Sequence, residues 1–302
     1  MQLCNYNDIQ TSSLGFGCSL LTRHNTIRAA IDNLNGAFES GITHFDVANV
    51  YGFGQAETIL GKFAAGKRQQ ITITTKTGLQ ARQLPLWALP LVNRARAVAK
   101  KMVQGNGTAS AALTNMQPAG SFNKATIVEN LNNSLKKIKT DYIDFYMLHE
   151  ATIGNANKEE VIDCLEHLKK QGKIRYAGIA SYADSIKNEY ATLNGFYKVV
   201  QHNDSPFTEY SSALPVTEQG RLRIVYNIFS QLPLVKQKMQ EANGTVNPIE
   251  ALLHYFHTIN NGGITLFAST QNKNIKNTAA VWSGLSTNSQ SSITDFLKII
   301  NS

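Results

Sequence analysis

Residues 41–61, with the sequence GITHFDVANVYGFGQAETILG, contain the pattern that decides the fold. Ile42, His44 and Asp46 alternate within a β-branched and aromatic run, which predicts a short buried strand that ends at Asp46. Residues 49–54 are rich in glycine and asparagine and predict a turn that carries Tyr51, and apolar residues at helical spacing then predict a helix. A carboxylate and a phenol thus flank the end of one strand, which is where ligands bind in sheets and barrels of strand–helix repeats.

The alternation of strand and helix continues on both sides of this unit. Besides the strand that ends at Asp46, strands are predicted at residues 14–18, 71–75, 142–148, 174–179, 198–201, 222–226 and 264–268. Helices are predicted at residues 26–40, 124–138 and 158–171, and around Asp184, Val216, Glu250 and Asn272. Eight strand–helix units in 302 residues predict an α/β fold, a (β/α)8 TIM barrel that forms a single domain over residues 1–302.

Two stretches fall outside this alternation. Residues 80–120 contain Pro85, Pro90, Pro118 and several glycines, so we expect a long loop after the third strand, with a short helix near residues 94–103. Residues 291–300 predict an extra C-terminal helix that packs against the barrel. The long loop is a candidate functional segment, although its sequence contains no readable motif.

Composition and charge narrow the class of protein. No run of 18 apolar residues occurs and the start of the chain does not resemble a signal peptide, so we expect a cytoplasmic protein without a membrane association. Three distant cysteines, Cys4, Cys18 and Cys164, indicate neither a disulfide framework nor a zinc site. The formal net charge of +8 comes from scattered basic residues, which argues against nucleic acid as the main ligand.

Lys76 and His149 are unusual residues for the ends of apolar strands. A lysine at the end of ITITTK is rarely buried unless it is paired, and Asp46 is its partner if the two strands are neighbours. The ammonium would then also reach the Tyr51 hydroxyl and lower its pKa, which makes the phenol a proton donor near neutral pH. A structural ion pair, and a histidine satisfied within the core, are the alternatives.

Several motifs together resemble the aldo-keto reductase family. The motifs are the strand that ends at Asp46 with its Tyr51-Gly52 pair, residues 71–78, 140–149, 173–181 and 199–201, and more weakly 265–277. The resemblance implies a (β/α)8 barrel and a catalytic tetrad of Asp46, Tyr51, Lys76 and His149 without a metal. It also implies an oxidoreductase that reduces an aldehyde or ketone with a nicotinamide cofactor held at the barrel mouth.

The resemblance assigns the cofactor site residue by residue. The assigned residues are Gly17, Ser181, Gln201, Tyr226, Ser269, Thr270, Lys273 and Asn277. Gln201 matches the glutamine that binds the carboxamide, and Tyr226 matches the aromatic residue that stacks on the ring. The sequence departs from the family at two other positions: Ala180 stands where the family has a serine, and Asn274 stands where it has an arginine. Lys273, next to Asn274, is the cation nearest to the missing arginine. NADPH is favoured over NADH, but by a smaller margin than an arginine would give.

Two other functional classes remain open from the sequence. One is a cofactor-binding sensor or regulatory subunit resembling the potassium-channel β subunits, which residues 80–120 would support. The other is a basic nucleic-acid-binding barrel. The leading interpretation predicts a small-molecule carbonyl substrate, no nucleic-acid or membrane partner, and a monomer or weak homo-oligomer.

Overall fold

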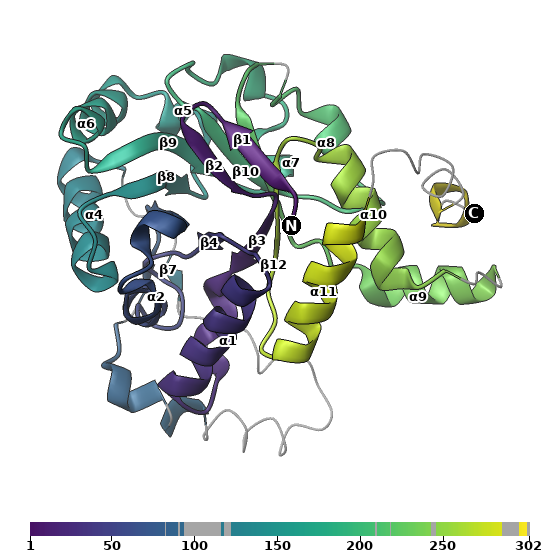
Figure 1. Cartoon of the computed structure of the whole chain (residues 1–302). Coiled ribbons are helices and arrows are strands. Elements are labelled where there is room, and N and C mark those ends of the chain that lie inside the picture. The colour runs from purple at the N-terminus through teal and green to yellow at the C-terminus, as the bar shows by residue number, and fades with distance from the viewer. Residues whose placement is uncertain are drawn as a thin grey trace.

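A computed structural model shows eight parallel strands closed into a barrel, with helices around the outside (Figure 1). The structure describes residues 1–81, 83–89, 91–93, 116–117, 122–208, 210–217, 219–242, 246–285 and 296–300. In chain order the barrel strands are β3 (Leu14–Gly17), β4 (His44–Asp46), β5 (Thr72–Thr77), β8 (Ile143–His149), β9 (Ile174–Ala180), β10 (Val199–Asn203), β11 (Leu222–Tyr226) and β12 (Ile264–Phe267). Neighbours in the barrel follow chain order, and β12 closes the ring on β3.

The helices follow the strands as a TIM barrel requires. The long ones are α1 (Ile27–Glu39), α2 (Ala56–Ala64), α4 (Lys124–Ile138), α6 (Glu159–Lys170), α9 (Leu232–Glu241), α10 (Pro248–Ile259) and α11 (Asn272–Gly284). The short ones are α5 (Ile153–Ala156), α7 (Ala183–Ile186) and α8 (Tyr210–Ala213), and the 3-10 turns are η1 (Cys18–Arg23), η2 (Arg68–Gln70), η3 (Leu86–Ala88) and η5 (Tyr190–Thr192). The predicted fold class is confirmed.

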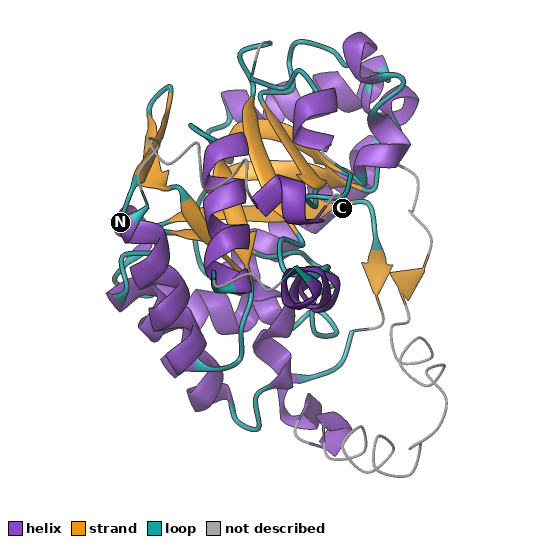
Figure 2. Cartoon of the chain, turned by 90° about the vertical axis from the view of Figure 1, so that its right-hand side faces the viewer, coloured by secondary structure: helices purple, strands orange, loops and turns teal. Residues whose placement is uncertain are grey.

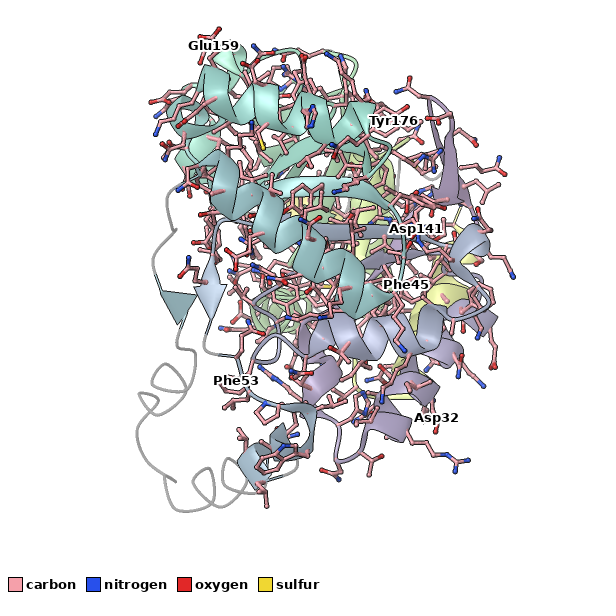
Figure 3. All side chains as sticks on the ribbon, turned by 90° about the vertical axis from the view of Figure 1, so that its left-hand side faces the viewer. Asp32, Phe45, Phe53, Asp141, Glu159 and Tyr176 are labelled. Atoms are coloured by element: carbon pink, nitrogen blue, oxygen red, sulfur yellow. The ribbon has the colours of Figure 1, made fainter. Side chains whose placement is uncertain are left out.

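The apolar side chains divide into an outer and an inner core. The outer core lies between the helices and the barrel, where one face of α2 buries Ile59 and Phe63 against Phe45 of β4. In Figure 3, Phe45 lies inside the molecule, whereas Asp32 and Glu159 lie at its outer edges. This packing explains the apolar spacing in the sequence, since each helix buries one stripe against the strands.

A hairpin that the sequence analysis missed covers one end of the barrel. It consists of β1 (Leu3–Tyr6) and β2 (Ile9–Ser12), paired antiparallel. Its Cys4 and Ile9 pack with the side chains inside the barrel, including Phe145 and Leu222. Leu222 is the first residue of its strand, so the hairpin covers the amino ends and leaves the carboxyl ends open for ligands.

Four details differ from the sequence prediction or extend it. Val216 lies in a turn, because α8 ends before Pro215, and proline cannot continue a helix without losing a hydrogen bond. A short pair of strands, β6 (Gln80–Ala81) and β7 (Met116–Gln117), stands beside the barrel (Figure 2). The helix expected at residues 94–103 lies outside the described residues. Residues 296–300 are helical, as expected, and Phe296 contacts Tyr255 of α10.

Candidate active site

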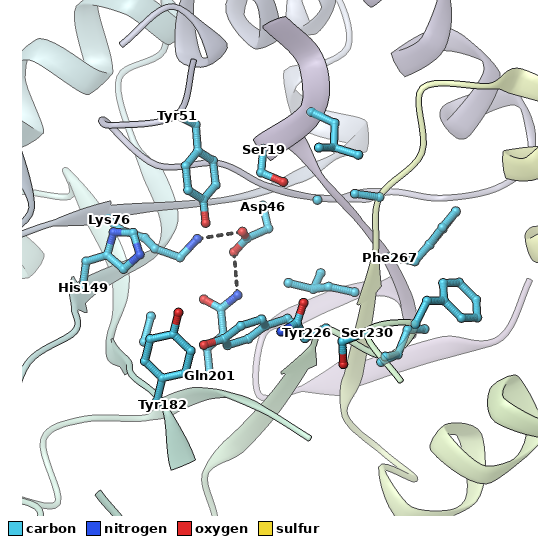
Figure 4. Close-up of a pocket in the computed structure, with 18 of the residues that line it drawn as sticks. Ser19, Asp46, Tyr51, Lys76, His149, Tyr182, Gln201, Tyr226, Ser230 and Phe267 are labelled. Carbon is cyan, nitrogen blue, oxygen red and sulfur yellow. Dashed lines mark hydrogen bonds and ion pairs between the residues drawn. The ribbon is translucent and has the colours of Figure 1, made fainter. Parts of the chain in front are cut away.

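Asp46 and Lys76 form a buried ion pair at the carboxyl ends of β4 and β5. The two strands are neighbours, and Lys76 Nζ lies 2.6 Å from Asp46 Oδ1. Nζ also donates a hydrogen bond to the carbonyl oxygen of Val47 at 3.1 Å. Gln201 Nε2, from β10, donates to Asp46 Oδ2 at 3.1 Å (Figure 4). The pairing expected from the sequence therefore forms, and each charge has partners that offset its removal from water.

Tyr51 and His149 lie above this pair and complete a wall of one cavity. The Lys76 Nζ atom lies 5.2 Å from the centre of the Tyr51 ring, and the hydroxyl of Tyr51 points toward the ion pair in Figure 4. The rings of Tyr51 and His149 meet edge to face, with centroids 6.1 Å apart. The structure thus brings Asp46, Tyr51, Lys76 and His149 together from three strand ends and one turn.

The turn that holds Tyr51 requires glycine at two positions. Gly52 and Gly54 have φ values of +58° and +77°, which side-chain-bearing residues rarely adopt. A Cβ atom on Gly52 would lie 2.1 Å from Thr22 Cγ2. Backbone hydrogen bonds from Gly54 and Ala56 to the carbonyl oxygen of Tyr51 tie the turn to the start of α2. The glycines in the sequence therefore serve to place Tyr51 over the barrel.

The tetrad surrounds a cavity of about 440 Å³, which we call the tetrad cavity. Asp46, Tyr51, Lys76 and His149 line it together with three residues assigned to the cofactor from the sequence, Gly17, Gln201 and Tyr226. Gln201 Oε1 is buried and has no hydrogen-bond partner among the described residues. His149 Nδ1 is likewise buried without a partner in the part of the chain that the structure describes, so these side chains provide charge, aromatic surface and two unsatisfied buried polar atoms.

Charge states in the tetrad cavity follow from burial. Desolvation raises the pKa of Tyr51 well above its usual value of 10.0, and the Asp46 carboxylate raises it further. This direction is opposite to the expected lowering of the pKa by Lys76, because desolvation by burial dominates and Lys76 lies 2.6 Å from the opposite charge of Asp46. Desolvation and the Lys76 charge lower the pKa of His149 to about 3. At neutral pH, Tyr51 is therefore a protonated phenol and His149 a neutral imidazole.

A second cavity of about 460 Å³ adjoins the first and shares Phe229, Phe267 and Ala268 with it. We call it the α11 cavity; its polar lining includes Asn247, Glu250, Ser269, Asn274, Asn277 and Thr278. Ser269 and Asn277 were both assigned to the cofactor from the sequence. Ser269 Oγ accepts a hydrogen bond from Gln271 N at 3.1 Å, which fixes the turn before α11.

Three assigned cofactor residues line neither cavity. The Ser181 hydroxyl donates its hydrogen to the carbonyl oxygen of Ala151 at 2.8 Å, which stabilises a turn and leaves the hydroxyl only as an acceptor. Thr270 and Lys273 are exposed at the start of α11 but are absent from the lining of both cavities. Lys273 therefore lies outside both cavity linings, on the exposed first turn of α11, and its role as a charge for the cofactor stays a prediction.

The sequence analysis also missed residues that line the cavities. Glu150 and Tyr182 line the tetrad cavity, and Glu250 lines the α11 cavity. Glu150 directly follows His149 at the end of β8, so its position at a strand end is the signal by which the sequence could have identified it.

Among the described residues, no group of three or more histidine, cysteine or acidic side chains gathers as a metal site would require. Within the same ranges, no helix combines the length and apolar character needed to cross a bilayer.

Known proteins resemble this chain in sequence and in fold. The model of the Aldo/keto reductase family matches residues 13–213. The Bacillus subtilis protein named Uncharacterized oxidoreductase YqkF is 30% identical over 220 residues, which cover 72% of this chain and 61% of that protein. Aldo-keto reductase YhdN of the same organism is 32% identical over 158 residues, which cover 52% of this chain and 38% of that protein. The matches thus span less than two thirds of either relative.

Solved structures extend the likeness to nearly the whole chain. Aldo-keto reductase AKR11C1 from Bacillus halodurans, in its holo form, has a TM-score of 0.74 at 22% identity and covers 99% of this chain and 95% of that one. An aldo-keto reductase from Klebsiella pneumoniae in complex with NADPH has a TM-score of 0.68 at 16% identity and covers 99% and 96%. At such low identity, these solved structures show likeness of fold alone. The family model, which matches more than half of the chain, shows the family. The chain therefore belongs to the aldo-keto reductase family of oxidoreductases.

Proposed function

We propose that this protein reduces an aldehyde or ketone to an alcohol, with Tyr51 as the general acid and a nicotinamide dinucleotide as the hydride source. The observation that carries the proposal is the buried pair of Lys76 and Asp46, 2.6 Å apart, set beneath Tyr51 and His149 at one cavity. A purely structural ion pair has no need of a phenol and an imidazole at its open side. Perturbed titratable groups gathered in one cavity favour catalysis over a structural role.

The residues of the two adjoining cavities fit such a dinucleotide. Gln201 Oε1 is a buried acceptor without a partner among the described residues, which a carboxamide N–H would satisfy. We infer that Gln201, Tyr226 and Gly17 hold the nicotinamide half, and that Ser269 and Asn277 of the α11 cavity hold the adenosine half. The bound dinucleotide supplies a hydride, which no amino-acid side chain can donate.

The chain itself handles the proton. Tyr51 transfers its hydroxyl proton to the carbonyl oxygen, and its raised pKa keeps that proton available at neutral pH. Neutral His149 hydrogen-bonds to the same oxygen and orients the substrate. Because only the protonated phenol is active in reduction, kcat should not fall on the alkaline side below about pH 10. An alkaline limb near neutral pH would show that Lys76 lowers the pKa of Tyr51 after all.

Steady-state oxidation of NADPH and NADH with a panel of aldehydes and ketones tests the proposal. We expect turnover with both cofactors and a modest preference for NADPH. Absence of turnover across the panel, despite cofactor binding, would favour the alternative of a sensor or regulatory subunit. The sequence feature that would support this alternative is the segment of residues 80–120, and the greater part of that segment lies outside the described residues.

A further inference from the structure

Glu150 is the ionised side chain on the tetrad cavity that lacks an ion pair in the described part of the chain. Asp46 and Lys76 are the other ionised residues of the lining, and they neutralise each other at 2.6 Å. His149 is neutral, since its pKa is lowered to about 3. Among the described lining residues, the charge that is not balanced is therefore the negative charge of Glu150, whose side chain is exposed.

The backbone at Glu150 is held in an unusual conformation. Its φ of +55° lies in the left-handed region, which is unfavourable for a residue with a side chain. Two contacts hold the turn: Glu150 N donates to the carbonyl oxygen of Ala180 at 2.7 Å, and the Ser181 hydroxyl donates to that of Ala151. Glycine or asparagine would adopt this conformation at lower cost. A carboxylate residue that lines the cavity in spite of an unfavourable backbone conformation is thus an observation that points to function.

The rest of the lining near Glu150 is aromatic or uncharged. Tyr51, Tyr182 and Tyr226 present rings and hydroxyls, and Tyr182 packs against Tyr226 with ring centroids 6.5 Å apart. The field of Glu150 reaches into this group, because its charge contributes to the raised pKa values of Tyr51 and Tyr226. Aromatic faces also attract cations, which adds to the pull of the carboxylate.

We propose that Glu150 selects substrates by charge, so that the tetrad cavity accepts neutral or cationic aromatic carbonyl compounds and disfavours those that carry a carboxylate or phosphate. This inference rests on the proposed carbonyl reductase function. Glu150 acts through its charge on the distal end of the substrate and takes no part in the proton transfer. Because the Glu150 side chain is exposed and screened by solvent, its charge should change kcat/KM for a charged substrate by about fivefold at most.

Three para-substituted benzaldehydes test the proposal. The 4-trimethylammonio and 4-tert-butyl compounds have nearly the same shape and differ in charge, and the 4-carboxy compound carries the opposite charge. Their intrinsic reactivities differ, so each is compared between the wild type and Glu150→Gln. We expect Glu150→Gln to lower kcat/KM for the cation by up to about fivefold, to raise it by up to about fivefold for the anion, and to leave the value for the tert-butyl compound unchanged.

A matched control removes one negative charge elsewhere. Glu160→Gln changes an exposed residue on α6 and should leave all three values unchanged. If Glu150→Gln destabilises the turn, Glu150→Asn removes the same charge with a residue that suits left-handed backbone. Both variants are checked by thermal unfolding before the kinetics are compared.

A binding measurement separates this inference from the proposed function. Calorimetric titration of the corresponding benzyl alcohols into the enzyme saturated with NADPH involves no turnover. Tighter binding of the cation in the wild type, lost in Glu150→Gln and weakened by salt, supports the inference even if no aldehyde is reduced. If the ratios of kcat/KM among the three aldehydes are the same in the wild type and in Glu150→Gln, the inference is overturned and the proposed function stays intact.

Discussion

The two adjoining cavities are built from different parts of the barrel. The tetrad cavity takes its ion pair from β4 and β5, where Asp46 and Lys76 are 3% and 2% exposed. The α11 cavity takes its polar side chains from α10, α11 and the turn before α11, and Glu250, Asn274 and Asn277 are exposed there. Strand ends in a closed barrel are held by neighbours on both sides, whereas helix starts face solvent. If the proposed function holds, the proton transfer takes place where the fold is rigid, and the residues proposed for the cofactor lie where substitution is tolerated.

Tyr51→Phe should have the largest effect on the tetrad cavity. It removes the donated proton and leaves the ring in place, so we expect reduction to slow by about 10² to 10⁴ while NADPH affinity stays near that of the wild type. Rates and fluorescence titrations of cofactor binding measure the two quantities. Tyr182→Phe is the control, since it removes another phenol of the same cavity. Near-normal turnover of Tyr51→Phe would refute the assigned general acid.

Lys76→Met tests whether the buried pair also supports the fold. Removing the ammonium leaves Asp46 charged and buried without its partner, so we expect the free energy of unfolding to fall by about 3–5 kcal/mol. Urea unfolding measures this loss. The double variant Lys76→Met with Asp46→Asn should recover part of it, because no unpaired charge remains. Equal instability of the single and double variants would mean that packing, and not charge, accounts for the loss.

Acid should destabilise the barrel through its buried histidines. His44, inside the barrel, hydrogen-bonds to Thr72 Oγ1 at 2.9 Å, and burial lowers its pKa to about 3. His44 in the unfolded chain binds a proton below its usual pKa of 6.5, whereas in the folded chain it does so only near pH 3, so stability falls as the pH drops through this window. Between pH 7.5 and 5 the loss should be about 2 kcal/mol for this histidine.

Urea midpoints at pH 7.5 and pH 5 measure this dependence. His44→Asn should be less stable at both pH values and should lose less stability between them. His167→Asn is the control, because this side chain lies on the surface of α6. If His44→Asn showed the same pH dependence as the wild type, other groups would account for the acid sensitivity.

The sequence was informative where a local pattern and the fold agree. The strand that ends at Asp46, helix α4 and the meeting of Asp46 with Lys76 were predicted, since strand-end positions in a parallel barrel share one face. The pKa of Tyr51 was predicted in the wrong direction, because burial and the balancing of Lys76 by Asp46 depend on three-dimensional packing. The four-residue hairpin strands and the position of Lys273 also depend on contacts distant in sequence, which periodicity does not encode.

The smallest expected effect concerns the α11 cavity and the choice of cofactor. Its described lining holds no lysine or arginine, and Glu250 contributes a negative charge. Lys273 lies at the start of α11 but outside that lining, so it can attract a 2′-phosphate only as an exposed point charge. We therefore expect NADPH to bind more tightly than NADH by less than about tenfold, or 1.4 kcal/mol.

Titration of both cofactors at low and high salt measures this preference. Exposed charges are screened beyond about 8 Å at physiological ionic strength, so added salt should weaken NADPH binding much more than NADH binding. Lys273→Gln should reduce the preference further, and Glu250→Gln should increase it, because the carboxylate repels the 2′-phosphate. Lys276→Gln, on the same helix and outside the cavity lining, is the matched control. A strong preference for NADPH that resists salt would mean that a basic residue outside the described ranges binds the 2′-phosphate. The weak charge of the α11 cavity would then be a property of its described residues alone.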